Sequence, residues 1–204
     1  MHASATTLEN NRVKLTVEVE ESAIDVAMDA TAKAFANDQA AFDAPPELAP
    51  LVHAMNRLLD RVPSLKMWKD GQGDMRKYQR IICEVGDRIA WVGGIGDDCA
   101  PGYFAVGCQA YTSSISNIAP KLSLKIAELG LKGDYAGLAA LMKKYVHPLY
   151  ALRDRCKGYE VSMMKSAMEI LGHPAGPVRP PLVNIKDSEL AELRQLMEVY
   201  SDVI

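Results

Sequence analysis

The chain has 204 residues, 49% of them apolar, and a formal net charge of −3 at pH 7. This length and apolar content suffice for one or two domains with a buried core, and the charge lacks the basic excess typical of nucleic-acid-binding proteins. No run is long and apolar enough to span a bilayer, and residues 1–11 lack the apolar core of a signal peptide. The four cysteines form no CxxC pair, so we expect reduced thiols in a cytoplasmic protein, without a disulfide or zinc site.

The first predicted element is a half-buried strand, because residues 12–20 alternate strictly between apolar and polar side chains. Such alternation suits an antiparallel setting, so we expect this strand to stand apart from any parallel sheet. Ser22 can cap a following helix, whose apolar positions recur at helical spacing to about Phe35. The prolines at 45 and 46 bar its continuation, and an amphipathic helix is predicted over residues 47–62.

The beginning of the chain resembles a chaperone. Residues 7–19 read Thr-Leu-Glu-Asn-Asn-Arg-Val-Lys-Leu-Thr-Val-Glu-Val, and over about residues 6–35 the chain is similar to the start of the ribosome-binding domain of trigger factor. In that family a basic Gly-Phe-Arg-Lys-type loop follows. Residues 37–46 read Asn-Asp-Gln-Ala-Ala-Phe-Asp-Ala-Pro-Pro instead, so we expect no ribosome contact.

Strands and helices then alternate. Short strands are predicted at residues 64–69, 89–93 and 109–114, with helices over residues 74–85 and around Tyr103 between them. Alternation of this kind is typical of βα units, so we expect the three strands to be parallel neighbours in an α/β fold. From Pro120 onward the pattern is helical. The helices are expected at residues 121–131, 134–155, 160–171 and 188–203.

Lys69 is the candidate reactive group, because it ends an apolar run before a Gly-rich turn. A partly desolvated lysine at the carboxyl end of a strand can present a free amine, which forms a Schiff base with a carbonyl. A solvated lysine before a turn is the simpler interpretation, and this residue alone does not decide between them. The Gly71-Gln-Gly73 segment is similarly either an anion-binding helix N-terminus or a plain turn.

A second resemblance covers about residue 63 to the C-terminus. Three stretches carry it: Trp-Lys-Asp-Gly-Gln-Gly-Asp at 68–74, Tyr-Thr-Ser-Ser-Ile-Ser-Asn-Ile-Ala-Pro at 111–120, and residues 157–165 with 172–182. They resemble the C-terminal half of the dihydrodipicolinate synthase/N-acetylneuraminate lyase family, in particular its 5-dehydro-4-deoxyglucarate dehydratase branch. Those proteins are Schiff-base aldolases and dehydratases on a (β/α)8 barrel.

The resemblance implies a site at the ends of the predicted strands. Lys69 takes the Schiff-base position, and the substrate is a small 2-oxo acid or a 2-oxo-3-deoxy sugar acid, with no metal and no cofactor. The implied substrate-binding residues are Gly93, Gly94, Thr112, Ser113, Ser114 and Asn117. Ordinary strand and turn polarity remains an equal interpretation of the run 112–114.

We therefore expect a partial TIM barrel, holding about the last three strands, behind an unrelated N-terminal strand and helix. The expected parts are residues 1–36, the junction and helix 37–62, the βα units 63–118 and the helical region 119–204. No counterpart of the family's carboxylate-binding loop or strand-5 tyrosine was identified, so weak turnover and oligomerisation or aggregation are expected. The alternative is an inactive chaperone-like folding or adaptor module.

Overall fold

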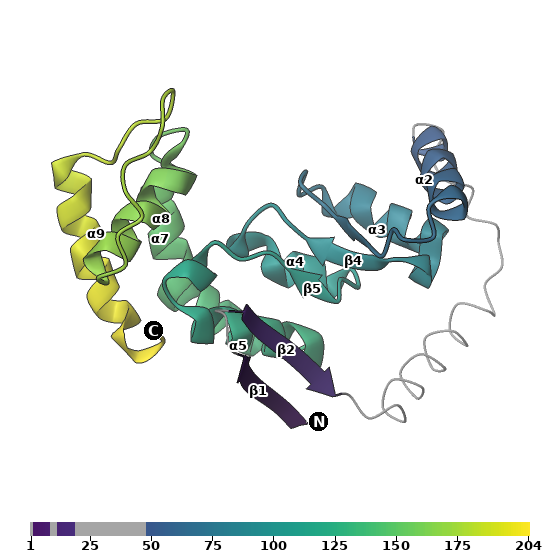
Figure 1. The fold of residues 1–204 in the computed structure, drawn as a ribbon, viewed down its shortest axis with the longest axis horizontal. Coiled ribbons are helices and arrows are strands. Elements are labelled where there is room, and N and C mark those ends of the chain that lie inside the picture. Colours follow the sequence, from purple (N-terminus) through teal and green to yellow (C-terminus); the bar gives the residue numbers. More distant parts are fainter. Residues whose placement is uncertain (1, 9–11, 19–47) are drawn as a thin grey trace. The chain divides into compact units, whose positions relative to one another are not determined.

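A computed structural model describes residues 2–8, 12–18 and 48–204. The chain divides into two compact units, residues 1–43 and 44–204. In the first unit, β1 (His2–Leu8) pairs antiparallel with β2 (Arg12–Glu18), in a register that sets Ala5 opposite Leu15 (Figure 1). The predicted strand and its antiparallel setting are confirmed, and β1 is an unpredicted partner. The predicted helix after Ser22 lies outside the described residues.

The second unit contains the predicted parallel sheet. Its strands β3 (Met67–Lys69), β4 (Ala90–Gly93) and β5 (Ala110–Tyr111) run parallel in the order β3-β4-β5 (Figure 1). The expectation of parallel neighbours is confirmed. Each strand is shorter than predicted, and β5 ends early because the serines after it turn toward a buried carboxylate rather than continue the ladder.

Helices connect and follow these strands. Local signals set several of their ends: Asp74 caps α3 by accepting a hydrogen bond from the Lys77 amide at 3.0 Å, and Asp134 caps α6 through the Gly137 amide at 2.8 Å. Gly133 ends α5 with a φ of +70°, a conformation that favours glycine. The α-helices are α2 (Ala49–Arg61), α3 (Met75–Val85), α4 (Ala100–Ala105), α5 (Pro120–Lys132), α6 (Tyr135–Leu141), α7 (His147–Arg153), α8 (Tyr159–Ile170) and α9 (Asp187–Val199).

The helix predicted over residues 134–155 is interrupted. Its two parts, α6 and α7, are joined by the π-helical turn Met142–Val146. Short 3-10 helices lie at Gly86–Arg88, Asp97–Cys99, Ile115–Asn117 and Tyr200–Asp202. None of the described helices is long and apolar enough to cross a membrane.

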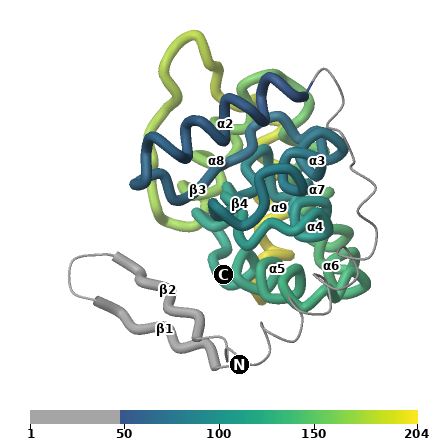
Figure 2. The backbone as a smooth tube through the Cα atoms, turned by 90° about the vertical axis from the view of Figure 1, so that its right-hand side faces the viewer, coloured from purple at the N-terminus to yellow at the C-terminus, as the bar shows by residue number. Residues whose placement is uncertain are grey.

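Two hydrophobic clusters form the core. One lies between the sheet and helices α2, α3 and α4, where the Tyr78 ring meets Trp91 and Tyr103 edge to face, at centroid distances of 5.7 and 5.9 Å. The other is formed mainly by α5 to α9, whose course can be followed in Figure 2. Tyr150 of α7 belongs to this second cluster.

Within residues 48–204 one face of the sheet packs against helices, and the other carries exposed side chains around the buried Val92. Along β3 the half-buried Trp68 packs against the first cluster, whereas Met67 and Lys69, which point the other way, are exposed. Met67 keeps 53% of its surface exposed. Lys69 therefore stands on the open face, at the carboxyl end of its strand.

Candidate functional site

The carboxyl ends of β3, β4 and β5 meet at one edge of the sheet, as parallel strands require. The Asp70 amide donates to the Val92 carbonyl at 2.9 Å, and the Thr112 amide donates to the Gly93 carbonyl at 2.8 Å. The ladder therefore brings the backbones of Lys69, Gly93 and Thr112 to the same edge. In parallel α/β folds this edge carries the chemistry.

Lys69 lies across Gly94. A Cβ placed on Gly94 would overlap Lys69 Cε and the Asp70 carbonyl oxygen, so only glycine leaves room for the lysine at this point. The position fits the prediction, but the expected desolvation does not: Lys69 is exposed. The physical reason is that β3 is an outer strand of the sheet formed by residues 48–204, so Lys69 has a neighbouring strand on one side alone.

Asp70 organises the turn that follows the lysine. Its buried carboxylate accepts hydrogen bonds from the Tyr103 hydroxyl at 2.7 Å, the Gly73 amide at 2.9 Å and the Gln72 amide at 3.2 Å. Burial, and next the hydrogen bond to Asp70, raises the pKa of Tyr103, which keeps its proton to donate. Because these amides already serve Asp70, the plain-turn interpretation of Gly71-Gln-Gly73 is the one that the geometry favours.

Gly93 has a packing role on the covered face. A Cβ there would overlap the Tyr103 ring, so the glycine lets this ring lie directly against the end of β4. Tyr103 in turn reaches Asp70 below the lysine turn. Gly93 and Gly94 thus act on opposite faces of the sheet: one admits a core tyrosine and the other admits Lys69.

Asp97 is the residue that sequence reasoning missed. It is fully buried, and its carboxylate accepts hydrogen bonds from the turn after β5 and from α7. The donors are the Ser113 hydroxyl, the Ser114 amide at 3.0 Å and hydroxyl at 2.8 Å, the Ile115 amide at 3.3 Å and the Tyr150 hydroxyl at 3.2 Å. The only local signal was an acidic pair, Asp97-Asp98, a few residues after the strand predicted at residues 89–93.

Tyr150 completes this network from α7. Burial, and next the nearby Asp97, raises the pKa of Tyr150 to about 12, so the hydroxyl stays protonated and donates to Asp97. The same hydroxyl oxygen accepts a hydrogen bond from the Asp97 amide at 2.7 Å. One tyrosine therefore fixes both the backbone and the side chain of Asp97.

The side chains of the predicted polar run all form hydrogen bonds within the protein, but they differ in exposure. The Ser113 and Ser114 hydroxyls donate to Asp97, and Ser113 also meets the Ser123 hydroxyl at 2.7 Å. Thr112 and Asn117 are exposed, and they donate to the backbone: the Thr112 hydroxyl to the Gly93 carbonyl at 3.4 Å and the Asn117 amide to the Ser114 carbonyl at 2.8 Å. The structure thus brings all these residues to the end of β5, but the two serine hydroxyls donate their hydrogen bonds to a buried carboxylate.

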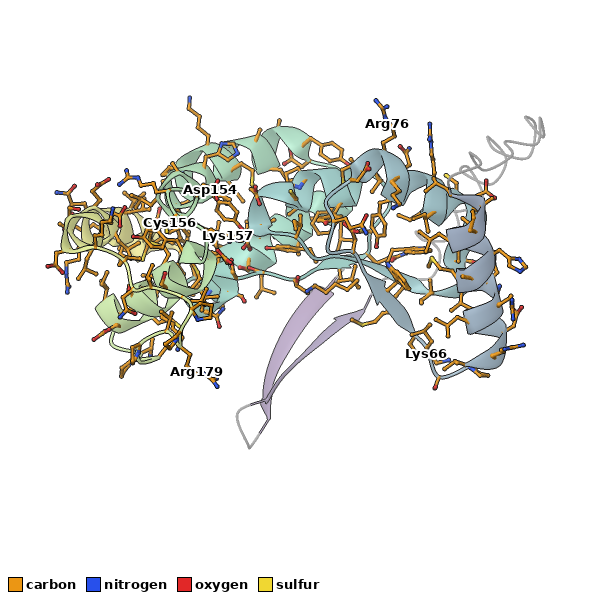
Figure 3. The ribbon with its side chains drawn as sticks, turned by 90° about the horizontal axis from the view of Figure 1, so that it is seen from above. Lys66, Arg76, Asp154, Cys156, Lys157 and Arg179 are labelled. Atoms are coloured by element: carbon orange, nitrogen blue, oxygen red, sulfur yellow. The ribbon has the colours of Figure 1, made fainter. Side chains whose placement is uncertain are left out.

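Arg153, the last residue of α7, reaches the same turn. Its Nη1 donates to the Ser114 Oγ at 3.3 Å, and its guanidinium carbon lies 4.4 Å from the centroid of the Tyr150 ring. Nearby, burial raises the pKa of Asp98, and the positive charge of Arg153 partly opposes this shift. The side chains of the next connection, from α7 to α8, are labelled in Figure 3, among them Asp154 and Lys157.

Two other features lie outside this arrangement. A cavity of about 350 Å³ opens between α8, α9 and the loop that joins them, lined by Lys165, Glu169, Asn184 and Arg194 among others. None of the predicted site residues lines it. Within residues 48–204, no three His, Cys, Asp or Glu side chains are grouped as a metal site would need.

Comparison with known proteins identifies related sequences. The model of the dihydrodipicolinate synthetase family matches residues 48–199. A probable 5-dehydro-4-deoxyglucarate dehydratase of Ralstonia nicotianae is 38% identical over 73% of this chain and 49% of its own length. The corresponding protein of Rhizobium rhizogenes is 40% identical over 70% of this chain and 48% of its own length.

Solved structures agree on the fold. The N-acetylneuraminate lyase of Aliivibrio salmonicida is 25% identical, with a TM-score of 0.62 over 74% of this chain and 49% of the other. A putative dihydrodipicolinate synthetase of Pseudomonas aeruginosa, at 22% identity, has a TM-score of 0.64 over 72% of this chain and 50% of its own.

The extent of these matches bears on the predicted domains. The chain spans about half the length of the curated relatives that it matches. The family match begins at residue 48, so it includes the helix α2 that we had placed in a junction. It gives no support to the trigger-factor resemblance over residues 6–35.

Proposed function

Because the chain belongs to the dihydrodipicolinate synthetase family, we propose that it acts as a class I aldolase-like lyase or dehydratase, with Lys69 as its Schiff-base residue. The observation that carries this proposal is the placement of Lys69. It ends a parallel strand, on the open face of the sheet, with its side chain laid over a glycine that leaves it room. This combination suits an amine that must be reached by a small carbonyl compound.

The chemistry follows from the amine. Lys69 Nζ adds to the oxo carbon of a 2-oxo acid, and loss of water gives an imine. The protonated imine withdraws electrons, so a proton can leave the neighbouring carbon and a hydroxyl on the next carbon can depart as water. Addition of water to the resulting imine releases the product and restores the lysine.

Residues beside Lys69 position this reaction. Asp70 fixes the turn that begins at the next residue, and Gly94 keeps the path of the lysine clear. We assign substrate contacts to the exposed Thr112 and Asn117 and to the backbone at Gly93 and Gly94. Ser113 and Ser114 hold the shape of the adjoining turn: both hydroxyls donate to Asp97, Ser113 Oγ accepts from the Ser116 amide, and Ser114 Oγ accepts from Arg153.

The curated relatives suggest the first substrate to test. They are named for 5-dehydro-4-deoxyglucarate, a six-carbon chain with a carboxylate at each end and an oxo group next to one of them. The mechanism above would remove one water from such a compound. The family match gives no support to the chaperone alternative, nor to the expected loss of turnover.

Borohydride trapping tests the proposal on the intact chain. With pyruvate and borohydride, the imine on Lys69 should be reduced to a stable secondary amine that peptide mass spectrometry locates. Lys69→Ala should abolish the label. Lys66→Ala is the matched control and should keep it, because Lys66 lies in the loop before β3, ahead of the strand's carboxyl end (Figure 3). A label confined to any lysine other than Lys69 would refute the assignment.

A further inference from the structure

Arg153 is held from two sides at the edge of the site. Its guanidinium stacks on the Tyr150 ring, 4.4 Å from the centroid, and donates to the Ser114 Oγ at 3.3 Å. Both supports are bonded to the buried Asp97. The arginine is thus oriented by a rigid network although its own side chain remains partly exposed.

The charge of Arg153 acts on the nearby Asp98 carboxyl, but the two groups form no direct ion pair. Within residues 48–204, no carboxylate lies within salt-bridge distance of Arg153. Arg155, two residues further on, contrasts with it: its two terminal nitrogens bind the Glu192 carboxylate at 2.9 Å each. Ser114 takes one of the five donors of Arg153, so the planar fork keeps donors that match a carboxylate.

Lys69 and Arg153 adjoin the ends of two strands that are separated by a third. β3 and β5 each neighbour β4, and adjacent strands lie about 4.8 Å apart, so the ends of β3 and β5 are about 10 Å apart. Lys69 extends from the first of these ends, and Arg153 reaches the turn that follows the second. The lysine side chain and the carbon chain of a sugar acid can together bridge this interval.

On the basis of the function proposed above, we propose that Arg153 is a specificity-determining residue that binds the second carboxylate of a dicarboxylic 2-oxo sugar acid. The first carboxylate adjoins the oxo group and stays near Lys69. The second lies at the far end of the chain, where a fixed and unpaired arginine is the chemical group that selects a diacid over pyruvate.

Imine trapping measures this selectivity on the full chain. The label on Lys69 is titrated with 5-dehydro-4-deoxyglucarate and, separately, with pyruvate. Arg153→Gln should raise the half-saturating concentration of the diacid about ten- to a hundredfold, as expected for lost hydrogen bonds to a charged group. The half-saturating concentration of pyruvate, which has no second carboxylate, should rise far less. Arg155→Gln should change neither titration, because its partner Glu192 lies elsewhere.

Other outcomes separate the two proposals. If Arg153→Gln weakens both ligands equally, or neither, Arg153 only supports the turn at Ser114 and the inference is wrong. If the unmodified chain takes no label from either ligand, the proposed function itself fails and the inference falls with it. Should Arg153→Gln not fold, Arg153→Lys decides: it keeps the charge but loses the fork, and it should still weaken the diacid more than pyruvate.

Discussion

Asp97 shows how much one buried side chain can control in this protein. Its carboxylate joins three segments that are distant in the sequence: the loop after β4, the turn after β5, and α7. Its two oxygens accept hydrogen bonds from hydroxyl and amide donors of the turn after β5 and of α7. The shape of the turn at Ser113 and Ser114, and through it the orientation of Arg153, follows from this one acceptor.

Replacing the acceptor tests this role. Asp97→Asn would set an amide donor against at least one of the present donors, leaving buried groups unsatisfied. We expect the free energy of unfolding to fall by about 3 kcal/mol, measured by urea denaturation.

The neighbouring Asp98→Asn is the matched control. Asp98 is more exposed than Asp97, so this change should lower the free energy of unfolding by less than about 1 kcal/mol. Equal losses for the two variants would contradict the network that we describe.

Sequence reasoning reached only part of this site. Lys69 and the two glycines follow local patterns, because each stands at the end of an apolar run or in a turn. Asp97 and Arg153 are instead placed by distant partners: Asp97 bonds to Tyr150, 53 positions away, and Arg153 bonds to Ser114, 39 positions away. A network built across such separations cannot be read from spacing within one segment.

At the scale of the elements, the spacing of apolar residues predicted whether a segment is a helix or a strand better than it predicted where the segment ends. The parallel strands were expected from the alternation of strands and helices, and the structure confirms them. β5 was predicted to include residues 112–114, but it ends at Tyr111 because Asp97 draws the next residues out of the ladder. The π-helical turn between α6 and α7 was missed, because the buried Met142, Val146 and Leu149 keep the three- to four-residue spacing of a continuous α-helix.

The packing of β4, α3 and α4 predicts different reactivities for Cys83 and Cys108. Burial raises the pKa of the Cys108 thiol to about 11, whereas Cys83, on α3, is exposed. Only the thiolate is alkylated, so Cys108 should react more slowly than Cys83 by at least about a hundredfold near pH 8. Timed alkylation with peptide mass spectrometry measures both rates on the native chain.

The alkylation rate of Cys108 should rise with pH over a range set by its raised pKa. Because the folded-state pKa of Cys108 lies above the ordinary value of 9.0, its thiolate forms only as the pH rises toward 11. Its rate in the native chain should keep climbing with pH through this range, and in denaturant it should approach that of Cys83. Equal native rates at pH 8 would mean that the cluster around Tyr78 and Trp91 opens readily.

At the scale of the unit of residues 44–204, the open face of the sheet is a candidate contact between copies of the chain. Met67, at 53% exposure, stands on it beside Lys69, and Ala90 and Ala110 of the neighbouring strands are also exposed, whereas Val92 between them is buried. Such an apolar face in water favours association, and the two outer strands offer unpaired backbone groups within residues 48–204. We therefore expect copies of the chain to associate through this face.

Sedimentation velocity over a range of protein concentrations tests that expectation. The unmodified chain should form oligomers, and Met67→Glu should lower the apparent association constant about tenfold or more, because a charge would be buried against an apolar surface. Leu131→Glu is the matched control: Leu131 is equally exposed, at 54%, but it lies on α5, away from the sheet. If association depends on the open face, only the first variant should change it. A chain that sediments as a monomer at every concentration, or an equal effect of both variants, would show that the open face is not the contact between copies.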